Sequence, residues 1–215
     1  MSTSTEDLIT NNGPDLDQVL MHLEFLAKPN AGLDPEYKFE IRAIREGAPP
    51  RSLLINPTND EGFEEALTFV NQANRQLFNV YVTVNPSRPS RPYVKDDDVI
   101  QIFFLFADAD ERGVVSQVKS DFIHNPDAYV CTGTKPHERG HFFWRLSEPV
   151  QPADFEQWRG LMQNIAKRHG CDSQICNPSR IMRLGGTVSY PSKAKRARGY
   201  QTELTAFYEY GGMYG

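Results

Sequence analysis

Asp108 and Asp110 end an apolar, aromatic run that begins at Val99. Side chains of a strand alternate between its two faces, so these carboxylates point the same way, roughly 6–7 Å apart. Like charges placed this close repel each other unless a cation lies between them. Mg²⁺ and Mn²⁺ prefer carboxylate oxygen and commonly bridge to substrate phosphates. The pair therefore indicates a divalent-metal site, although a strand that simply emerges into solvent also commonly ends in aspartate.

Four more residues could take part in the same chemistry. His141 opens a second aromatic run, where it could bond a triphosphate oxygen or a nucleotide sugar, or could be only a half-exposed polar residue. Asp172 follows a helical pattern and offers a third carboxylate. Arg180 and Arg183 are spaced i, i+3, so on a helix they would share one face and offer two cations to an anion.

The charge of the chain is unevenly distributed. Its formal net charge is −5, yet the segment 173–201 has no acidic residue. Six cations lie in that segment: Arg180, Arg183, Lys193, Lys195, Arg196 and Arg198. A second loop without acids, residues 85–92, contains Arg88 and Arg91. Basic segments beside a carboxylate cluster suit an enzyme that holds phosphates, although a solvated basic loop has the same composition.

Composition indicates a globular protein. The 215 residues are 39% hydrophobic and 11% aromatic, and no apolar stretch reaches the roughly 18 residues that a membrane helix needs. The polar, acidic start is unlike a signal peptide, and the sparse cysteines favour reduced thiols in the cytoplasm. Cys131, Cys171 and Cys176 lack the paired Cys-x₂-Cys of a zinc knuckle, so even with His169 nearby reduced thiols are favoured over zinc. We expect a soluble, cytoplasmic protein without a membrane partner.

The periodicity of apolar residues predicts the elements that position these groups. Helices are expected over residues 15–26, 59–76, 111–123 and 152–169, with Asp15 and Gly170 as caps, and a turn or helical segment over 181–184. Strands are expected over 37–45, 79–84, 99–110, 129–132, 141–146 and 202–210, the third of them central and buried on both faces. Residues 1–14 are expected to form a flexible tail. The order is α/β (α+β), with an antiparallel pair over 129–146.

Taken in this order, the motifs resemble the catalytic core of the archaeo-eukaryotic primase superfamily, and most closely the RepB-like and PrimPol-like primase-polymerases of plasmids, phages and integrated mobile elements. The family's three motifs are matched by Asp108-x-Asp110, by Gly140-His141 before an aromatic strand, and by Asp172 with residues 178–187. The resemblance covers roughly residues 79–205. It has two departures: Arg139 stands where the family usually has serine, which puts a hydroxyl contact to the nucleotide in doubt, and Gly185-Gly186 replaces Pro-Gly.

The resemblance implies a primase fold with a mixed or antiparallel sheet. An RRM-like catalytic half would span about 79–210 and an N-terminal α/β lobe about 15–78. Residues 15–215 would form a single catalytic domain, and the end of the chain just after a strand favours a piece of a longer replication protein.

The resemblance also implies an activity, template-directed nucleotidyl transfer by a DNA primase or primase-polymerase. Asp108, Asp110 and Asp172 would hold two Mg²⁺ or Mn²⁺ ions. An NTP or dNTP would contact His141, Arg183, Arg180 and Lys193. Single-stranded DNA template would contact Arg88, Arg91, Lys195, Arg196 and Arg198. A helicase or another replication domain, fused or associated, would be a partner.

Two alternatives belong to other classes. A metal-dependent nuclease also needs clustered carboxylates and a histidine, but it does not need Arg180 and Arg183, so dependence on a triphosphate separates the two activities. A non-catalytic module that binds single strands or origins would keep the basic segment without three acids. The absence of a Gly-x₄-Gly-Lys-Ser/Thr phosphate loop argues against a helicase or ATPase in this stretch.

Overall fold

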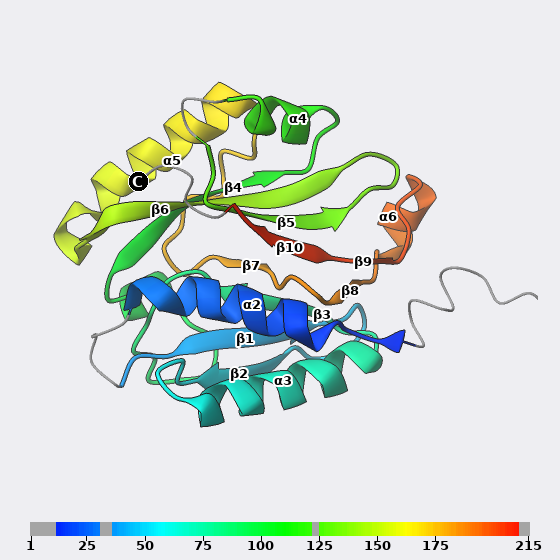
Figure 1. The fold of residues 1–215 in the computed structure, drawn as a ribbon, viewed down its shortest axis with the longest axis horizontal. Helices are drawn as coiled ribbons and strands as arrows, with labels where there is room; N and C mark the ends of the chain where they lie inside the picture. The colour runs from blue at the N-terminus through cyan, green and yellow to red at the C-terminus, as the bar shows by residue number, and fades with distance from the viewer. Residues whose placement is uncertain (1–11, 31–35, 122–124, 211–215) are drawn as a thin grey trace, which may run out of the picture.

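The computed structural model describes residues 12–30, 36–121 and 125–210. Most of the expected tail, residues 1–11, lies outside the described residues. The described chain folds into two four-stranded antiparallel sheets and a two-stranded one, with helices packed against them (Figure 1). The expected mixed α/β class with antiparallel pairing is thereby confirmed. No helix in the described part is long and apolar enough to cross a membrane.

The first sheet has the strand order β2-β1-β3-β7. Its strands are β2 (Arg51–Ile55), β1 (Phe39–Ile44), β3 (Asn79–Thr83) and β7 (Ile181–Arg183). Helix α3 (Asp60–Arg75) packs on β1, β2 and β3, and α2 (Leu16–Ala27) contacts both α3 and the second sheet. The sheet therefore joins residues from both sides of the boundary expected near residue 78.

The second sheet has the order β10-β5-β6-β4. Its strands are β10 (Ala206–Glu209), β5 (Ala128–Gly133), β6 (Arg139–Val150) and β4 (Ile102–Ala109). Strand β4 is an edge strand, so the expectation of a central strand is wrong. It is nevertheless mostly buried, because α5 (Phe155–His169) covers it and Trp158 Nε1 donates to Phe104 O at 3.1 Å. An apolar run indicates that a strand is buried, but it does not indicate whether the strand has hydrogen-bonded neighbours on one side or on both.

The basic segment contains short elements that periodicity did not reveal. Strand β8 (Val188–Ser189) pairs with β9 (Glu203–Leu204), and α6 (Lys193–Ala197) lies between them in the chain. Residues 181–183 form β7 rather than a helical turn, because they pair with β3. Helix α4 (Val114–Lys119) is shorter than expected, and residues 122–124 of that prediction lie outside the described chain. Three 3₁₀ turns complete the order: η1 (Lys28–Asn30), η2 (Asp96–Asp98) and η3 (Pro152–Asp154).

Local signals in the sequence did place the long helices. The Asp15 side chain caps α2 by accepting from Gln18 N–H, and Asn59 caps α3 by accepting from Gly62 N–H. These bonds satisfy backbone donors that a helix start leaves free. Gly170 ends α5 with φ 72°, a left-handed conformation that glycine adopts without strain. The predicted caps at Asp15 and Gly170 are confirmed.

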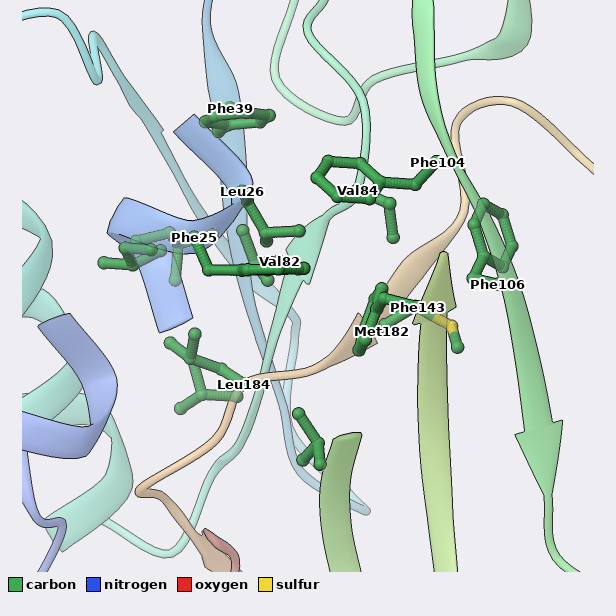
Figure 2. Packing of buried hydrophobic residues seen from close by; sticks show 14 of the residues in the cluster. Phe25, Leu26, Phe39, Val82, Val84, Phe104, Phe106, Phe143, Met182 and Leu184 are labelled. Carbon is green, nitrogen blue, oxygen red and sulfur yellow. The ribbon is translucent and has the colours of Figure 1, made fainter. Parts of the chain in front are cut away.

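One hydrophobic cluster joins the two large sheets. Figure 2 shows side chains of α2, β3, β4, β6 and the β7 segment meeting there: Phe25, Leu26, Val82, Val84, Phe104, Phe106, Phe143, Met182 and Leu184. The ring of Phe25 lies 5.3 Å from that of Phe104 and 5.5 Å from that of Phe207. Since interiors of this kind are close-packed, the core fixes the sheets relative to each other. Residues from both sheets can then define one site.

Candidate functional site

The pairing of β4 with β6 sets the position of both aspartates. Asp108 lies opposite His141, and Ala109 lies opposite Gly140. A Cβ atom on Gly140 would come within 2.1 Å of the Tyr129 ring, so only glycine fits there. Asp110 follows β4 directly, next to the start of β6. Both aspartates line one cavity, which agrees with the expectation that their carboxylates share a face.

That cavity has a volume of about 300 Å³ and receives side chains from both large sheets. The first sheet contributes Asn79, Tyr81 and Arg183, and the second contributes Asp108, Thr132, Arg139 and His141. Asp110 and the segments around α6 complete the lining with Ser189, Tyr190, Pro191, Ser192, Lys195, Tyr200 and Gln201. A polar cavity of this size lies within the range for small-molecule sites.

His141 is a neutral side chain in this site. Burial, with the nearby Arg183 guanidinium adding to it, lowers its pKa to about 3. Its Nδ1 accepts the Arg183 backbone N–H at 3.2 Å, so we assign the ring proton to Nε2. Nε2 lies 3.6 Å from Asp108 Oδ1, which is too long for a hydrogen bond. His141 therefore presents a neutral donor beside Asp108 and forms no ion pair with it.

Asp108 carries a charge that is poorly stabilised. Burial, together with the carboxylates of Asp110 and Asp172, raises its pKa to about 7 against the opposing effects of Lys195 and Arg180. Near neutral pH the carboxyl group is thus divided between its protonated and ionised forms. A cation bound beside it would favour the ionised form.

Asp110 has two cationic neighbours. Its Oδ1 lies 3.6 Å from Arg139 Nε, and its Oδ2 lies 3.9 Å from Lys195 Nζ. Arg139 is buried, with 5% of its side chain exposed, whereas 46% of the Lys195 side chain is exposed. Sequence reasoning noted Arg139 only as a departure from the family. Its i, i+2 spacing from His141 mirrors that of the two aspartates, but only the strand register, with Ala109 opposite Gly140, brings it next to Asp110.

The backbone of Asp172 lies beside the backbone of Asp108. Its N–H contacts Asp108 O at 3.3 Å. Its exposed side chain faces its own loop, where Oδ1 accepts Gln174 N–H at 2.9 Å. Asp172 does not line the cavity. The structure therefore brings the backbone of this third acid to the site, and its carboxylate stays outside the cavity wall.

The donor chemistry of the pair fits a hard divalent cation. Asp108 and Asp110 offer oxygen ligands in one polar cavity, and burial together with the neighbouring carboxylates raises the pKa of Asp108, an effect that a bound cation would oppose. In the part of the chain that the structure describes, no three His, Cys, Asp or Glu side chains are grouped closely enough to hold a metal ion. Two of the three expected ligands, Asp108 and Asp110, line the cavity, and the third expected ligand, Asp172, does not.

Arg183 is the cation that the first sheet contributes to the cavity. Its Nη1 donates to Asn79 Oδ1 at 2.7 Å, and its guanidinium carbon lies 4.4 Å from the centre of the Tyr81 ring. No acidic side chain among the described residues forms an ion pair with it. The expectation that Arg180 and Arg183 share a helical face is wrong, because Arg183 belongs to β7. Arg180 lies in the preceding loop, near enough to lower the pKa of Asp108.

The other predicted cations are divided between the α6 region and a distant loop. Lys195 lines the cavity, whereas the exposed Lys193 does not. The remaining two, Arg196 and Arg198, contact Thr202 and the Tyr200 ring. Arg88 and Arg91 do not line the cavity: Arg91 pairs with Asp98 at 3.3 Å, and the Arg88 N–H donates to Asp98 O.

Several cavity residues were not anticipated from sequence. Asn79, Tyr81, Thr132, Ser189, Tyr190, Ser192 and Tyr200 are polar or aromatic residues without a motif. Only strand register reveals that Tyr81 lies opposite Arg183.

Cys131, Cys171 and Cys176 are free and partly buried.

Comparison with known proteins shows similarity in structure. No protein-family model and no curated protein sequence matches this chain. The AEP domain of the cyanophage S-2L primase-polymerase (PrimPol) aligns with a TM-score of 0.64 and 22% identity, over 94% of each chain. The primase RepB′ aligns at 0.56 and 11% identity, over 89% of this chain and 56% of that one. The RepB′ catalytic domain in complex with initiator DNA aligns at 0.54 and 12% identity, over 87% and 84%. The chain therefore has an archaeo-eukaryotic primase fold, which confirms the predicted resemblance.

Proposed function

We propose that this protein is a template-directed nucleotidyltransferase, a DNA primase or primase-polymerase that joins nucleotides on single-stranded DNA. One observation carries the proposal: a single cavity receives the Asp108–Asp110 pair from the end of β4 and, from β7 of the other sheet, Arg183, a cation with no acidic partner among the described residues. A nucleoside triphosphate needs cationic contacts for its phosphates, and phosphoryl transfer needs carboxylates for metal ions. The primase fold supports the same assignment.

The residues of the chain then take separate roles. Asp108 and Asp110, joined by Asp172 once its side chain turns from its own loop toward them, would hold Mg²⁺ or Mn²⁺, which when bound lowers the pKa of an attacking hydroxyl and neutralises phosphate charge. Arg183 is placed to bind the triphosphate, because Asn79 and Tyr81 fix its guanidinium. His141 can donate from Nε2 to a phosphate or sugar oxygen. Positioned donors of this kind supply most of the catalysis in such reactions.

The α6 region supplies the surface for the template. Lys195 and Arg198 lie over the ring of Tyr200, which lines the cavity, and Arg196 belongs to the same short helix as Lys195. Basic side chains next to an aromatic ring suit a single strand. A structural neighbour, the RepB′ catalytic domain, was solved with initiator DNA. Lys193 belongs with this surface rather than with the nucleotide. Arg88 and Arg91 could form a second surface that contacts the template. A helicase or other replication domain stays a predicted partner.

The test is a nucleotide-incorporation assay with labelled NTPs or dNTPs, single-stranded template, and Mg²⁺ or Mn²⁺, with and without a primer. The proposal expects labelled products whose sequence follows the template. A template that is shortened without triphosphate would instead favour the nuclease alternative. Binding of single strands without incorporation under any of these conditions would favour the non-catalytic alternative.

A further inference from the structure

Arg139 is the first residue of β6, and its guanidinium lies between two carboxylates. Nε is 3.6 Å from Asp110 Oδ1, and Nη2 is 3.6 Å from Glu203 Oε2. Only 5% of the Arg139 side chain is exposed, compared with 44% for Asp110. A buried guanidinium with a fixed orientation thus contacts a carboxylate that has much more freedom.

The orientation of Arg139 is fixed from several sides. Nη1 donates to Lys135 O, and the guanidinium carbon lies 4.1 Å from the centre of the Tyr200 ring. A Cβ atom on Gly133 would lie 2.0 Å from Nη2, so the absence of a side chain there leaves the space that the guanidinium occupies. These contacts keep the side chain from swinging into solvent.

Glu203 connects this guanidinium to the turn between β5 and β6. Its carboxylate accepts the N–H of Thr134 at 2.8 Å, the Thr134 hydroxyl at 2.6 Å and the Lys135 N–H at 3.2 Å. A chain of contacts therefore runs from this turn through Glu203 and Arg139 to Asp110.

We propose that Arg139 is a positioning residue, which holds the Asp110 carboxylate toward the cavity beside Asp108. This inference rests on the proposed function. Asp110 lies just past the end of β4, so the strand ladder does not fix its side chain, and its other cationic neighbour, Lys195, is itself half exposed. At 3.6 Å the pair is an ion pair without a hydrogen bond, and a guanidinium held in one orientation fixes the direction of that attraction more narrowly than a flexible ammonium does. A small misplacement of a catalytic group costs much of the rate.

A purely structural role, neutralising Glu203, makes a different prediction, and four variants separate the two. Arg139→Gln removes the guanidinium, Glu203→Gln removes its structural partner, and the double variant removes both. Arg139→Lys keeps the charge without the fork. Thermal melts, steady-state incorporation kinetics and nucleotide-free Mn²⁺ binding, measured by EPR, are recorded for each.

We expect Glu203→Gln to keep kcat within about threefold of wild type, and the double variant to regain stability relative to Arg139→Gln. Its kcat should stay about 10- to 100-fold below wild type, with KM for the nucleotide little changed, and Arg139→Lys should recover part of that loss. Mn²⁺ binding by Arg139→Gln should weaken. Loss of a positive charge would by itself tighten that binding, so weaker binding identifies the lost orientation of Asp110.

Recovery of kcat in the double variant would overturn the role of Arg139. Mn²⁺ binding by Arg139→Gln that is unchanged or tighter would also overturn it. In either case, wild-type activity would still support the proposed function. A wild-type protein that incorporates no nucleotide would overturn the proposed function and this role together.

Discussion

Asp108 lies opposite His141 in the β4–β6 ladder, and His141 Nε2 is 3.6 Å from Asp108 Oδ1. At the next position on the same face, Asp110 meets Arg139 at the same distance. The two aspartates therefore have different partners, one neutral and one permanently charged. This difference gives the two carboxylates different expected effects on stability.

Asp108→Asn should raise stability at alkaline pH in buffer that contains EDTA. The folded-state pKa of Asp108, about 7, lies above the ordinary aspartate value of 3.8. Its contribution to stability is therefore fully present below the lower value and is lost as pH rises through the higher one. Thermal melts should show the variant above wild type near about pH 8 and the difference shrinking toward about pH 5, with roughly 2–4 °C in Tm for each kcal/mol. Parallel profiles for the two proteins would contradict the raised pKa.

Asp110→Asn is the matched control for that experiment. It removes a carboxylate from the same cavity, but leaves the buried Arg139 with Glu203 as its remaining ion-pair partner. Loss of the Asp110 carboxylate also relieves part of the Asp108 charge, so we expect a smaller gain in Tm at alkaline pH from this variant than from Asp108→Asn.

Arg183→Ala should weaken nucleotide binding while the fold survives. A charge-assisted phosphate contact contributes roughly 1.5–3 kcal/mol, or about 10- to 100-fold in Kd. Stability should change little, because no described acidic residue pairs with Arg183 and Asn79 Oδ1 still accepts the Tyr190 N–H. Nucleotide titrations and a thermal melt check both parts. Unchanged affinity with a large drop in Tm would show that Arg183 has a structural role.

Arg198→Ala should weaken single-strand binding and reduce its salt dependence. Loss of one phosphate contact lowers the slope of log K against log salt by about 0.7. Fluorescence anisotropy with a labelled oligonucleotide over a salt series measures this slope. Lys167→Ala, an exposed cation on α5 outside the α6 region, is the control and should leave the slope unchanged. Equal slopes for all three proteins would remove Arg198 from the template surface.

Asp96→Ala should loosen the loop that carries Asp172 and Arg180. Asp96 Oδ1 accepts the Ser179 N–H at 3.0 Å and its hydroxyl at 2.6 Å, and Oδ2 lies 3.2 Å from Arg159 Nη2. Loss of this acceptor should cost about 1–3 kcal/mol of stability. Hydrogen exchange should rise over residues 173–180 and stay unchanged in α3. Unaltered protection of that loop would contradict the role given to Asp96.

Sequence reasoning succeeded where a signal is local. Alternation along residues 99–110 placed both aspartates on one face, and cap residues such as Asp15 and Gly170 located helix ends. Sequence reasoning failed where pairing between segments that are distant in the chain decides the structure. Residues 181–183 became a strand because β3 offered them partners. Strand β4 is at the edge of its sheet because β6 is its one neighbour in the strand order, and it is buried because α5 covers it.

The cavity residues that come from the first sheet could not be predicted from the sequence either. Asn79 and Tyr81 precede the first motif and match no pattern, yet strand register brings them to Arg183. Arg139 could be recognised as unusual, but its two carboxylate partners come from β9 and from the residue after β4. Long-range register of this kind has no signature in a single sequence.

The double variant Asp108→Ala/Asp110→Ala tests the central claim most directly, in an incorporation assay on single-stranded template paired with a thermal melt. Its stability should stay near wild type, because relief of the buried Asp108 charge offsets the lost partner of Arg139. Glu64→Ala/Glu65→Ala, which removes two exposed carboxylates from α3, is the control and should keep wild-type incorporation. The account predicts no incorporation by a folded Asp108→Ala/Asp110→Ala protein, and incorporation at the wild-type rate by that protein would contradict it.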